Sequence, residues 1–259
     1  MSACSLVTAI PAYNEGDRLY AFLQDWAATA AAIQNPRVTA IVVDDGSRDS
    51  EAARHQQAVD AANAVLTADH LHQVRYLRAE RNQGKGASIR WAWSSCGEAA
   101  AWFGFIDGDG ALPAREFWRL AGMLPEATVD VVCGSRIKIA GRTVERSMFR
   151  HIQGRAFATA VDELFHLGIY DTQCGLKFFR AATLQPLLRS LQEDRWLLDV
   201  EILARLHHAG ARTIEIPVDC HQAGASSLVF GVDSVKMLAR LVRLRRRLRA
   251  EGALGGPAS

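Results

Sequence analysis

The chain has few cysteines, and their spacing joins them into no familiar pattern. Among its 259 residues five are cysteine, an odd number without a C-x-x-C pair: Cys4, Cys96, Cys133, Cys174 and Cys220. This argues against a disulfide framework and against a structural zinc site, because both need cysteines at paired spacings.

Long apolar runs and a strong charge imbalance are missing as well. No run approaches the ~20 apolar residues of a membrane-spanning helix, and the first residues lack the segments of a signal peptide. We therefore expect a cytoplasmic protein. The formal net charge of +2 is too small to indicate nucleic-acid binding by itself. With 49% hydrophobic and 22% charged residues the composition is globular, and the length suits one large α/β domain.

Short apolar runs alternate with helical patterns, which is typical of a mostly parallel sheet flanked by helices. The expected strands are residues 6–10, 39–43, 73–77, 102–106, 129–133, 178–179 and 213–218. The expected helices are residues 17–33, 48–69, 86–96, 113–124, 144–167, 181–191, 199–209 and 232–249. We expect a single domain over residues 1–231, a basic amphipathic helix within 232–251 and a flexible tail over 252–259.

Two aspartates one residue apart follow the apolar run 102–106, as Asp107-Gly108-Asp109. Ligands of open α/β sheets bind at the carboxyl ends of the strands. Two carboxylates at such an edge are costly to desolvate unless a cation or hydrogen-bond donors neutralise them. The spacing suits one Mg²⁺ or Mn²⁺ whose shell is completed by substrate phosphates. A solvated Asp-Gly-Asp-Gly turn is the alternative.

Other carboxylates follow neighbouring strands. Glu15 comes after the first strand, and Asp44 and Asp45 after the second. At one sheet edge these charges repel unless a cation or ligand donors lie among them. Ser47 or Asp49 has an alternative role as a helix cap. Asp45 precedes the turn glycine, where a carboxylate suits a ribose hydroxyl pair or a base N–H.

Two further sets of residues carry positive charge. Asn82-Gln83-Gly84-Lys85-Gly86 precedes a helix, so its glycines, the helix amino terminus and Lys85 together suit a phosphate. It lacks the Walker A pattern, and a solvated loop is the alternative. The second set is four arginines. Arg136, just past a strand, suits a phosphate contact, whereas Arg155 is expected on a solvated face; Arg146 and Arg150 share one helical face.

Seven motifs occur in the order seen in family 2 glycosyltransferases. They read P-x-Y-N-E, V-V-D-D-G-S, N-x-G-K-G, D-x-D, G-S-R, D-T-Q-C-G-x-K and R-W-x-x-D-V-E-x-L. The chain resembles the polyprenyl-phosphate subgroup, the dolichyl-phosphate glucosyl- and mannosyltransferases. It is most similar to the glucosyl enzymes, through residues 82–90, 171–177 and 195–203, and the likeness spans about residues 6–227.

The resemblance implies a GT-A fold, a Rossmann-like sheet that binds a nucleotide-diphosphate sugar such as UDP-glucose or GDP-mannose. In the family, the residues matching Pro11, Tyr13, Glu15 and Asp45 hold the nucleoside, and those matching Asp107 and Asp109 hold the metal and diphosphate. The match to Arg136 implies a phosphate contact on the acceptor side. The segments 173–177 and 196–201 line the sugar and acceptor pocket in the family, and they include Gln173, Lys177, Trp196 and Glu201.

The expected reaction is an inverting, metal-dependent transfer of a hexose, glucose or mannose, to a polyprenyl phosphate. A lipid phosphate is already anionic and needs no strong general base. A soluble hydroxyl acceptor would need one, and Asp199 is then the first candidate. The alternative for Asp199 and Glu201 is a helix-start charge. A non-catalytic nucleotide-sugar-binding protein is a third hypothesis, against which Asp107, Asp109 and the D-T-Q-C-G-x-K string argue.

The chain departs from the family at three places. Cys220 stands where an aromatic residue is common, the basic residue expected after Ser226-Ser227 is missing, and Gly108 replaces an alanine. We expect the first two changes to affect how the donor or acceptor phosphate is bound.

The last helix combines a basic face with an apolar stripe. Its basic residues are Lys236, Arg240, Arg243, Arg245, Arg246, Arg247 and Arg249, and its stripe consists of Val235, Leu238, Leu241, Val242, Leu244 and Leu248. Such a helix can lie in an anionic bilayer interface, peripheral on the inner face of the membrane, or contact a membrane partner subunit. The alternative is that the stripe packs on the domain. We expect no nucleic-acid partner, because no stacking platform accompanies the arginines.

Overall fold

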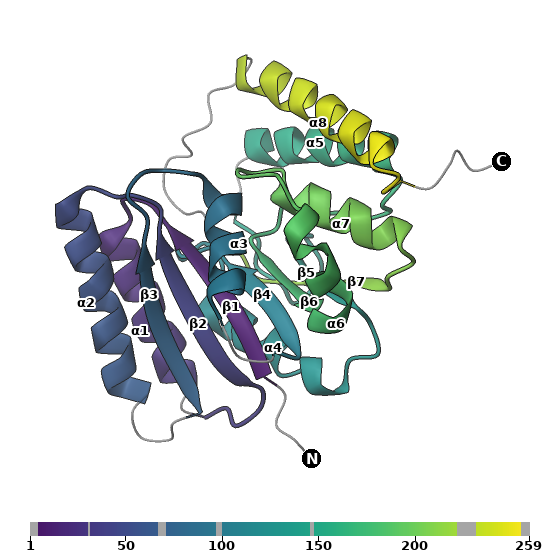
Figure 1. The fold of residues 1–259 in the computed structure, drawn as a ribbon. Helices are drawn as coiled ribbons and strands as arrows, with labels where there is room; N and C mark the ends of the chain where they lie inside the picture. The colour runs from purple at the N-terminus through teal and green to yellow at the C-terminus, as the bar shows by residue number, and fades with distance from the viewer. Residues whose placement is uncertain are drawn as a thin grey trace.

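A seven-stranded sheet runs through the molecule in the order β3-β2-β1-β4-β6-β5-β7 (Figure 1). The computed structural model describes residues 5–30, 32–66, 71–96, 100–145, 148–221 and 232–254. The strands are β1 Ser5–Ala12, β2 Arg37–Asp44, β3 His72–Arg78, β4 Trp102–Ile106, β5 Val131–Ser135, β6 Leu176–Arg180 and β7 Thr213–Pro217. Only β6 pairs antiparallel, with β4 and β5, and the other pairs of the sheet are parallel.

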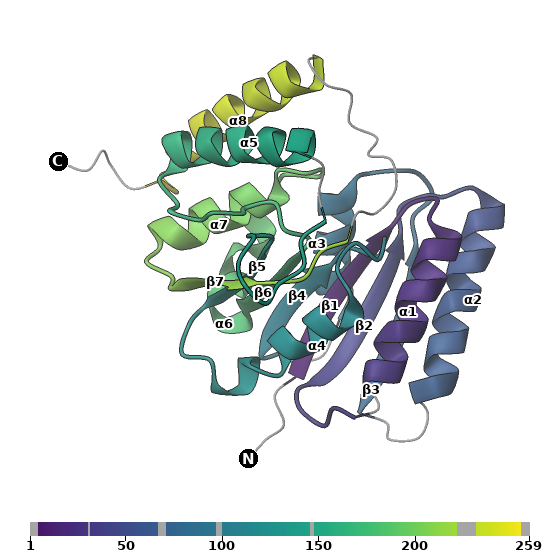
Figure 2. The ribbon, with the colours of Figure 1, turned by 180° about the vertical axis from the view of Figure 1, so that it is seen from behind.

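Helices cover both faces of the sheet (Figures 1 and 2). They are α1 Gly16–Ala30, α2 Asp49–Leu66, α3 Lys85–Ser95, α4 Ala114–Ala121, α5 Met148–Phe165, α6 Ala181–Leu184, α7 Leu198–His208 and α8 Val232–Ala250. Strand side chains alternate between two buried clusters, as a pleated strand requires. Leu6 and Val42 join α1, α2 and α4 in one cluster, while Val7 and Ile41 join α3, α5, α7 and α8 in the other.

The expected α/β fold with a mostly parallel sheet is confirmed. Most helix bounds differ from the expected ones by one to three residues, and two helices differ for a visible structural reason. The helix expected over 144–167 begins at Met148 among the described residues, because Val144 instead forms a β-bridge with Cys220. The helix expected over 181–191 is one α-helical turn followed by a 3-10 segment, Gln185–Ser190. Pro186 lies at the start of that segment and cannot donate the backbone hydrogen bond of a continuing helix.

Much of the apolar stripe of α8 packs on the domain. Leu241, Leu244 and Leu248 are buried in the second cluster, so this part of the stripe is not available for a membrane. Leu238 is 50% exposed. The side chain of Val235 lies outside the described part of the structure. Leu254, in the expected tail, is also buried, and no described helix is both long and apolar enough to cross a bilayer.

Candidate functional site

The carboxyl ends of β1, β2 and β4 bring the acidic residues together. These strands are parallel neighbours, so Glu15, Asp45 and Asp107 all follow the same edge of the sheet. The β1 and β2 ends are tied by a hydrogen bond from Asp45 N to Ala12 O, 2.9 Å long. The convergence expected from the strand order is thus present in the structure.

The aspartate pair lies in an electrostatically crowded place. Burial first, and then the neighbouring charge of Asp107, raises the pKa of Asp109. Burial and both aspartates raise the pKa of Glu15 to about 7, although Arg18 and His55 oppose this. Lys85 Nζ lies 2.6 Å from Asp107 Oδ1 and neutralises part of the charge. The three carboxylates therefore repel one another, and a bound cation would relieve the repulsion.

Asp107 and Asp109 can hold Mg²⁺ or Mn²⁺ only if a bound substrate supplies further ligands to the ion. Across the described ranges, no group of three or more histidine, cysteine or acidic side chains is arranged to hold a metal. Asp107 and Asp109 supply carboxylate oxygens, the ligands that these hard cations prefer. Mg²⁺ characteristically takes one or two carboxylates and fills its shell with water and substrate phosphates. The pair is therefore compatible with such a site.

Gly175 makes room for the Asp107 carboxylate. A Cβ placed on Gly175 would lie 2.1 Å from Asp107 Oδ2 and 2.5 Å from its Cγ, closer than any side chain tolerates. Gly175 O also accepts a hydrogen bond from Asp107 N at 3.0 Å. The glycine of the D-T-Q-C-G-x-K string thus forms one wall of the acidic site. This role was not predicted from the sequence, although the glycine between Cys174 and Lys177 in that string was a signal for it.

Gly108 also has a packing reason. Its Cβ would lie 3.0 Å from both Ile10 Cγ2 and Leu19 Cδ1. An alanine, usual in the family at this position, would need these two neighbours to move by a few tenths of an ångström. The change from the family pattern is therefore matched to the core beneath it.

Asp45 holds the glycine loop. Its Oδ1 accepts from Gln83 N at 2.7 Å and its Oδ2 from Gly84 N at 2.8 Å. Burial raises the pKa of Asp45, although these two hydrogen bonds oppose the rise. Each carboxylate oxygen that was expected to face a nucleoside thus already has a backbone partner, which makes Asp45 an organiser of the loop as well as a candidate ligand.

Asp44 is buried beneath the site and does not face it. Although burial opposes the change, His55, whose Nδ1 lies 3.4 Å from Asp44 Oδ2, and hydrogen bonds from Ser47 and Tyr76 lower the pKa of Asp44. His55 Nε2 in turn accepts from Glu15 N at 3.3 Å. Ser47 Oγ accepts from Asn14 N at 2.9 Å, so this hydroxyl ties the β1 and β2 ends together and does not merely cap a helix.

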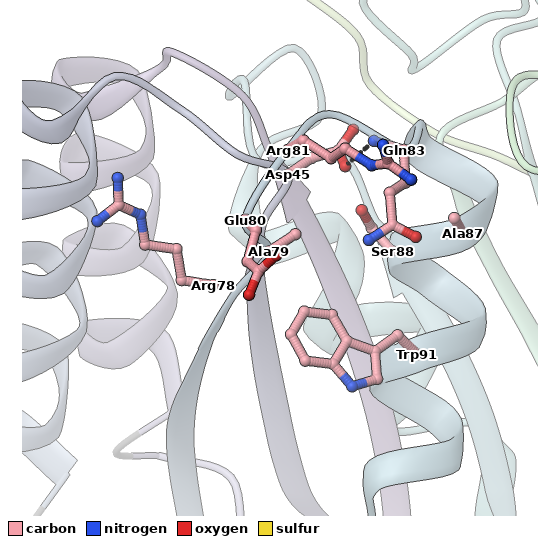
Figure 3. A pocket seen from close by; sticks show the side chains of 9 residues that line it. All are labelled: Asp45, Arg78, Ala79, Glu80, Arg81, Gln83, Ala87, Ser88 and Trp91. Atoms are coloured by element: carbon pink, nitrogen blue, oxygen red, sulfur yellow. Dashed lines mark hydrogen bonds between the residues drawn. The ribbon is translucent and has the colours of Figure 1, made fainter.

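A cavity of about 620 Å³ opens beside Asp45 (Figure 3). Arg81 and Gln83 surround the Asp45 carboxylate, and the Trp91 ring extends from α3 into the space below them. The full lining is Asp45, Arg78, Ala79, Glu80, Arg81, Gln83, Ala87, Ser88 and Trp91. The volume lies within the range of small-molecule sites. Pro11, Tyr13 and the aspartate pair do not line this cavity, and Tyr13 is exposed.

Arg136 is held by Asp171. Its Nε and Nη2 lie 2.7 and 2.8 Å from the two carboxylate oxygens, a bidentate pair. Burial alone would lower the pKa of Arg136 and raise that of Asp171. The ion pair outweighs burial, so the pKa of Arg136 is higher than usual and the pKa of Asp171 is lower than usual. Glu215 fixes this segment by accepting from Tyr170 N and Asp171 N at 2.7 and 2.9 Å.

Arg155 packs against the same segment. Its guanidinium lies 3.9 Å from the centre of the Tyr170 ring, and Nη1 donates to Tyr170 O at 2.8 Å. The prediction of a solvated Arg155 is therefore wrong. Arg146 lies outside the described residues, as do the side chain of Arg150 and the pair Ser226-Ser227.

Lys177 and Asp199 form a buried ion pair. Lys177 Nζ lies 3.0 Å from Asp199 Oδ2 and 2.6 Å from Cys174 O, and the lysine has no exposed surface. Burial lowers the pKa of Lys177, but Asp199, Cys133 and Cys174 together raise it by more. Asp199 is thus occupied as the counter-ion of a buried ammonium, which opposes its expected role as a free general base. Lys177 likewise has no surface open to a ligand, because its ammonium is enclosed with Asp199 and Cys174 O.

The remaining expected residues divide between surface and core. Trp196 is 39% exposed just before α7, and Gln173 is half-buried beside Asp171. Glu201, by contrast, is completely buried. It accepts from two backbone N–H groups and from Arg205 and Arg247, so the structure places it in the protein core and not on the wall of an open pocket.

Solved structures share the fold at low sequence identity. A glucosyl-3-phosphoglycerate synthase from Mycobacterium tuberculosis, in complex with Mn²⁺ and UDP-glucose, matches with a TM-score of 0.62 and 15% identity, covering 100% of this chain and 81% of the other. A mannosyltransferase from Pyrobaculum calidifontis, in complex with GDP-mannose and Mn²⁺, matches with a TM-score of 0.59 and 18% identity, covering 98% and 65%. The expected GT-A fold is confirmed.

Curated relatives are more similar in sequence. A dolichyl-phosphate beta-glucosyltransferase of Dictyostelium discoideum is 29% identical over 93% of this chain and 74% of its own length. The enzyme of the same name from Homo sapiens is 31% identical over 86% of this chain and 69% of its own. The model of the family named "Glycosyl transferase family 2" matches residues 8–196. With that match over most of its length, the chain belongs to glycosyltransferase family 2.

Proposed function

We propose that this protein transfers a hexose, glucose in the first instance, from a nucleotide-diphosphate sugar to a polyprenyl phosphate, with inversion at the anomeric carbon. The observation that carries the proposal is the similarity over most of the chain to proteins named dolichyl-phosphate beta-glucosyltransferase. These relatives are named for both the hexose and the lipid-phosphate acceptor.

The donor side of the proposal uses the acidic edge and the glycine loop. Asp107 and Asp109 would hold Mg²⁺ or Mn²⁺, and a bound cation there would stabilise the charge of the departing nucleotide diphosphate. Lys85, 2.6 Å from Asp107, adds a positive charge at the same place. Pro11, Tyr13, Glu15 and Asp45 are the proposed nucleoside contacts, at the carboxyl ends of β1 and β2.

The acceptor side needs positioning more than deprotonation. A lipid phosphate is anionic near neutral pH and attacks without a strong base. This agrees with Asp199, whose carboxylate is paired with Lys177. Arg136 is the proposed contact of the acceptor phosphate. Because Asp171 takes its Nε and Nη2, we place the phosphate at Nη1. Gln173 and Trp196 are the proposed contacts near the sugar.

We further propose that the outward face of α8 lies on the inner surface of a membrane, where a polyprenyl acceptor resides. Leu238 and Val242 line a shallow groove with the basic Arg243 and Arg246. At the start of α5, which runs beside α8 in both ribbon views (Figures 1 and 2), Met148 is also strongly exposed. Each basic residue near an anionic surface contributes about 1 kcal/mol to binding.

The test is a transfer assay with purified protein and Mg²⁺ or Mn²⁺. Donors are a panel of UDP- and GDP-sugars, and acceptors are a short polyprenyl phosphate and soluble hydroxyl compounds. We expect hexosyl-phosphate lipid to form with the polyprenyl phosphate, and Asp109→Asn to lower kcat by roughly a hundred-fold or more, as loss of a group that stabilises transition-state charge does.

Two outcomes would contradict the proposal. Transfer to hydroxyl acceptors alone would refute the lipid phosphate, and full activity of Asp109→Asn would refute the metal site. The Asp25→Asn variant is the matched control, because it makes the same chemical change outside the proposed metal site. Asp25 lies on α1, and its carboxylate accepts a hydrogen bond from Ala114 N.

A further inference from the structure

The buried carboxylate of Glu201 holds a loop that packs against the glycine loop 82–86. Glu201 on α7 is completely enclosed and has four donors. Its Oε2 accepts from Gln192 N at 3.0 Å and Glu193 N at 2.8 Å. Its Oε1 accepts from Arg205 Nη2 at 3.1 Å and from Arg247 Nη2 of α8 at 2.9 Å. The loop 191–195 is thus bound from behind by one carboxylate and two arginines.

Arg247 also reaches the loop directly. It donates to Gln192 Oε1 at 3.2 Å and lies 3.4 Å from Glu193 Oε1. Arg205 adds a bond to Ser190 O at 3.1 Å. A buried charge with this many partners is expensive to disturb, because removal of one partner leaves the others desolvated and unpaired.

The front of the same loop touches the glycine loop. A Cβ on Gly84 would lie 2.4 Å from Asp194 O, and one on Gly86 would lie 2.5 Å from Glu193 O. Ala87 N donates to Asp194 O at 3.0 Å, and Arg90 donates to Leu191 O at 2.6 Å. The two loops therefore meet backbone to backbone at Gly84 and Gly86, although Arg195 Cγ would also lie 2.8 Å from a Cβ on Gly84, so a shift of one loop presses directly on the other.

The glycine loop, in turn, carries the groups that face the donor. Gln83 N and Gly84 N bind Asp45, and Lys85 Nζ binds Asp107. A displacement of residues 192–195 would therefore move Lys85 and the Asp45 contacts together. The mechanism proposed above makes no use of Glu201 or Arg247.

We infer that Glu201 and Arg247 are positioning residues for the donor site, and that α8 acts through them on Lys85 and Asp45. Coupling of this kind passes through packed, discrete contacts, and a double-mutant cycle is its direct test. The inference rests on the proposed function only for the identity of the donor, since the geometric link between α8 and the glycine loop is independent of the sugar or acceptor.

The experiment compares Arg247→Gln with Arg249→Gln, an exposed arginine two residues along the same helix. Hydrogen exchange followed by mass spectrometry reports on residues 83–87 without any need for activity. We expect these amides to exchange roughly five-fold faster in Arg247→Gln and unchanged in Arg249→Gln, in line with a lost charged hydrogen bond. In the assay, the donor KM should rise about five- to ten-fold while the acceptor KM stays within about two-fold.

Gly86→Ala disturbs the same contact from the other side, so its effect on donor KM should not add to that of Arg247→Gln. Faster exchange confined to residues 190–195, or equal rises in both KM values, would overturn the inference. If Arg247→Gln does not fold, Arg247→Lys keeps the charge but loses the forked geometry, and the same comparison of residues 83–87 applies. A chain that shows the exchange effect but no transfer would refute the proposed function alone.

Discussion

Gly175 determines where the carboxylate of Asp107 can lie. Its missing Cβ leaves the space that Asp107 Oδ2 occupies, 2.1 Å from where the Cβ would be. Because Gly175 precedes β6 and Asp107 follows β4, the two segments cannot separate without breaking the sheet. Any side chain at this position must therefore displace the Asp107 carboxylate.

We expect Gly175→Ala to lower kcat by about a hundred-fold, since misplacement of a catalytic group by roughly 1 Å costs this much. The unfolding midpoint should change far less, and circular dichroism should show the same fold. Gly122→Ala is the control, because its added Cβ would approach only the carbonyl oxygens of Trp118 and Arg119, at 3.3 and 3.7 Å, at the end of α4. Equal activity of the two variants would show that Asp107 tolerates the shift.

The raised pKa of Glu15 predicts how the free energy of unfolding depends on pH. Burial and the nearby aspartates raise its pKa from 4.5 to about 7 in the folded protein. The folded state therefore binds this proton more tightly than the unfolded state, and stability falls as pH rises from about 4.5 through 7. Above that window the folded protein carries the full cost of an ionised, crowded carboxylate.

The Glu15→Gln variant should remove this dependence. With a chelator present, its stability relative to the natural chain should increase by about 1–3 kcal/mol between pH 5 and pH 8. Urea unfolding at the two pH values measures the difference. A difference that does not vary with pH would show that Glu15 is not the group that titrates.

At the scale of elements, α8 has one face buried against the domain and one face that is exposed. Leu241, Leu244 and Leu248 are buried against the domain, whereas Leu238 is exposed beside Arg243 and Arg246. The sequence pattern alone shows an amphipathic helix, but it does not show which apolar residues have a partner. That distinction depends on where α5 and α7 lie.

Two substitutions on α8, one on each face, distinguish membrane binding from stability. Leu238→Glu should reduce sedimentation with anionic vesicles and leave the unfolding midpoint unchanged, because the side chain lies in the outward groove. Leu244→Ala should lower the free energy of unfolding by about 2–4 kcal/mol and leave vesicle binding of the folded protein intact. Vesicle binding that survives Leu238→Glu would refute membrane contact through this face.

The elements themselves were largely predictable from the sequence, and the pairing of charges was not. Asp107 and Asp45 could be placed because each directly follows a buried apolar strand, and parallel strands end at one edge. The partners of Lys177, Arg136 and Glu201 could not be found this way. Each pairs with a residue remote in the chain, and such a pairing is fixed only when β6, α7 and α8 have packed.

At the scale of the whole molecule, the motifs form one connected structure. The N-x-G-K-G loop contacts Asp45 on one side and the loop before α7 on the other. That second loop is bonded to α8 through Glu201. Segments from both halves of the chain therefore support the proposed donor site, and we expect a truncation that removes α8 to alter it as well as the outer surface.

The reversed direction of β6 has a consequence for how the site tolerates change. Every other strand ends at the acidic edge, but β6 begins there, with Ile106 opposite Leu176 and Phe105 opposite Lys177. A slip of one residue in this pairing would carry Gly175 away from Asp107 and turn Lys177 to the opposite face of the sheet. The proposed cation site and the buried ammonium thus depend on a single register, so we expect an insertion or deletion in β6 to abolish both at once.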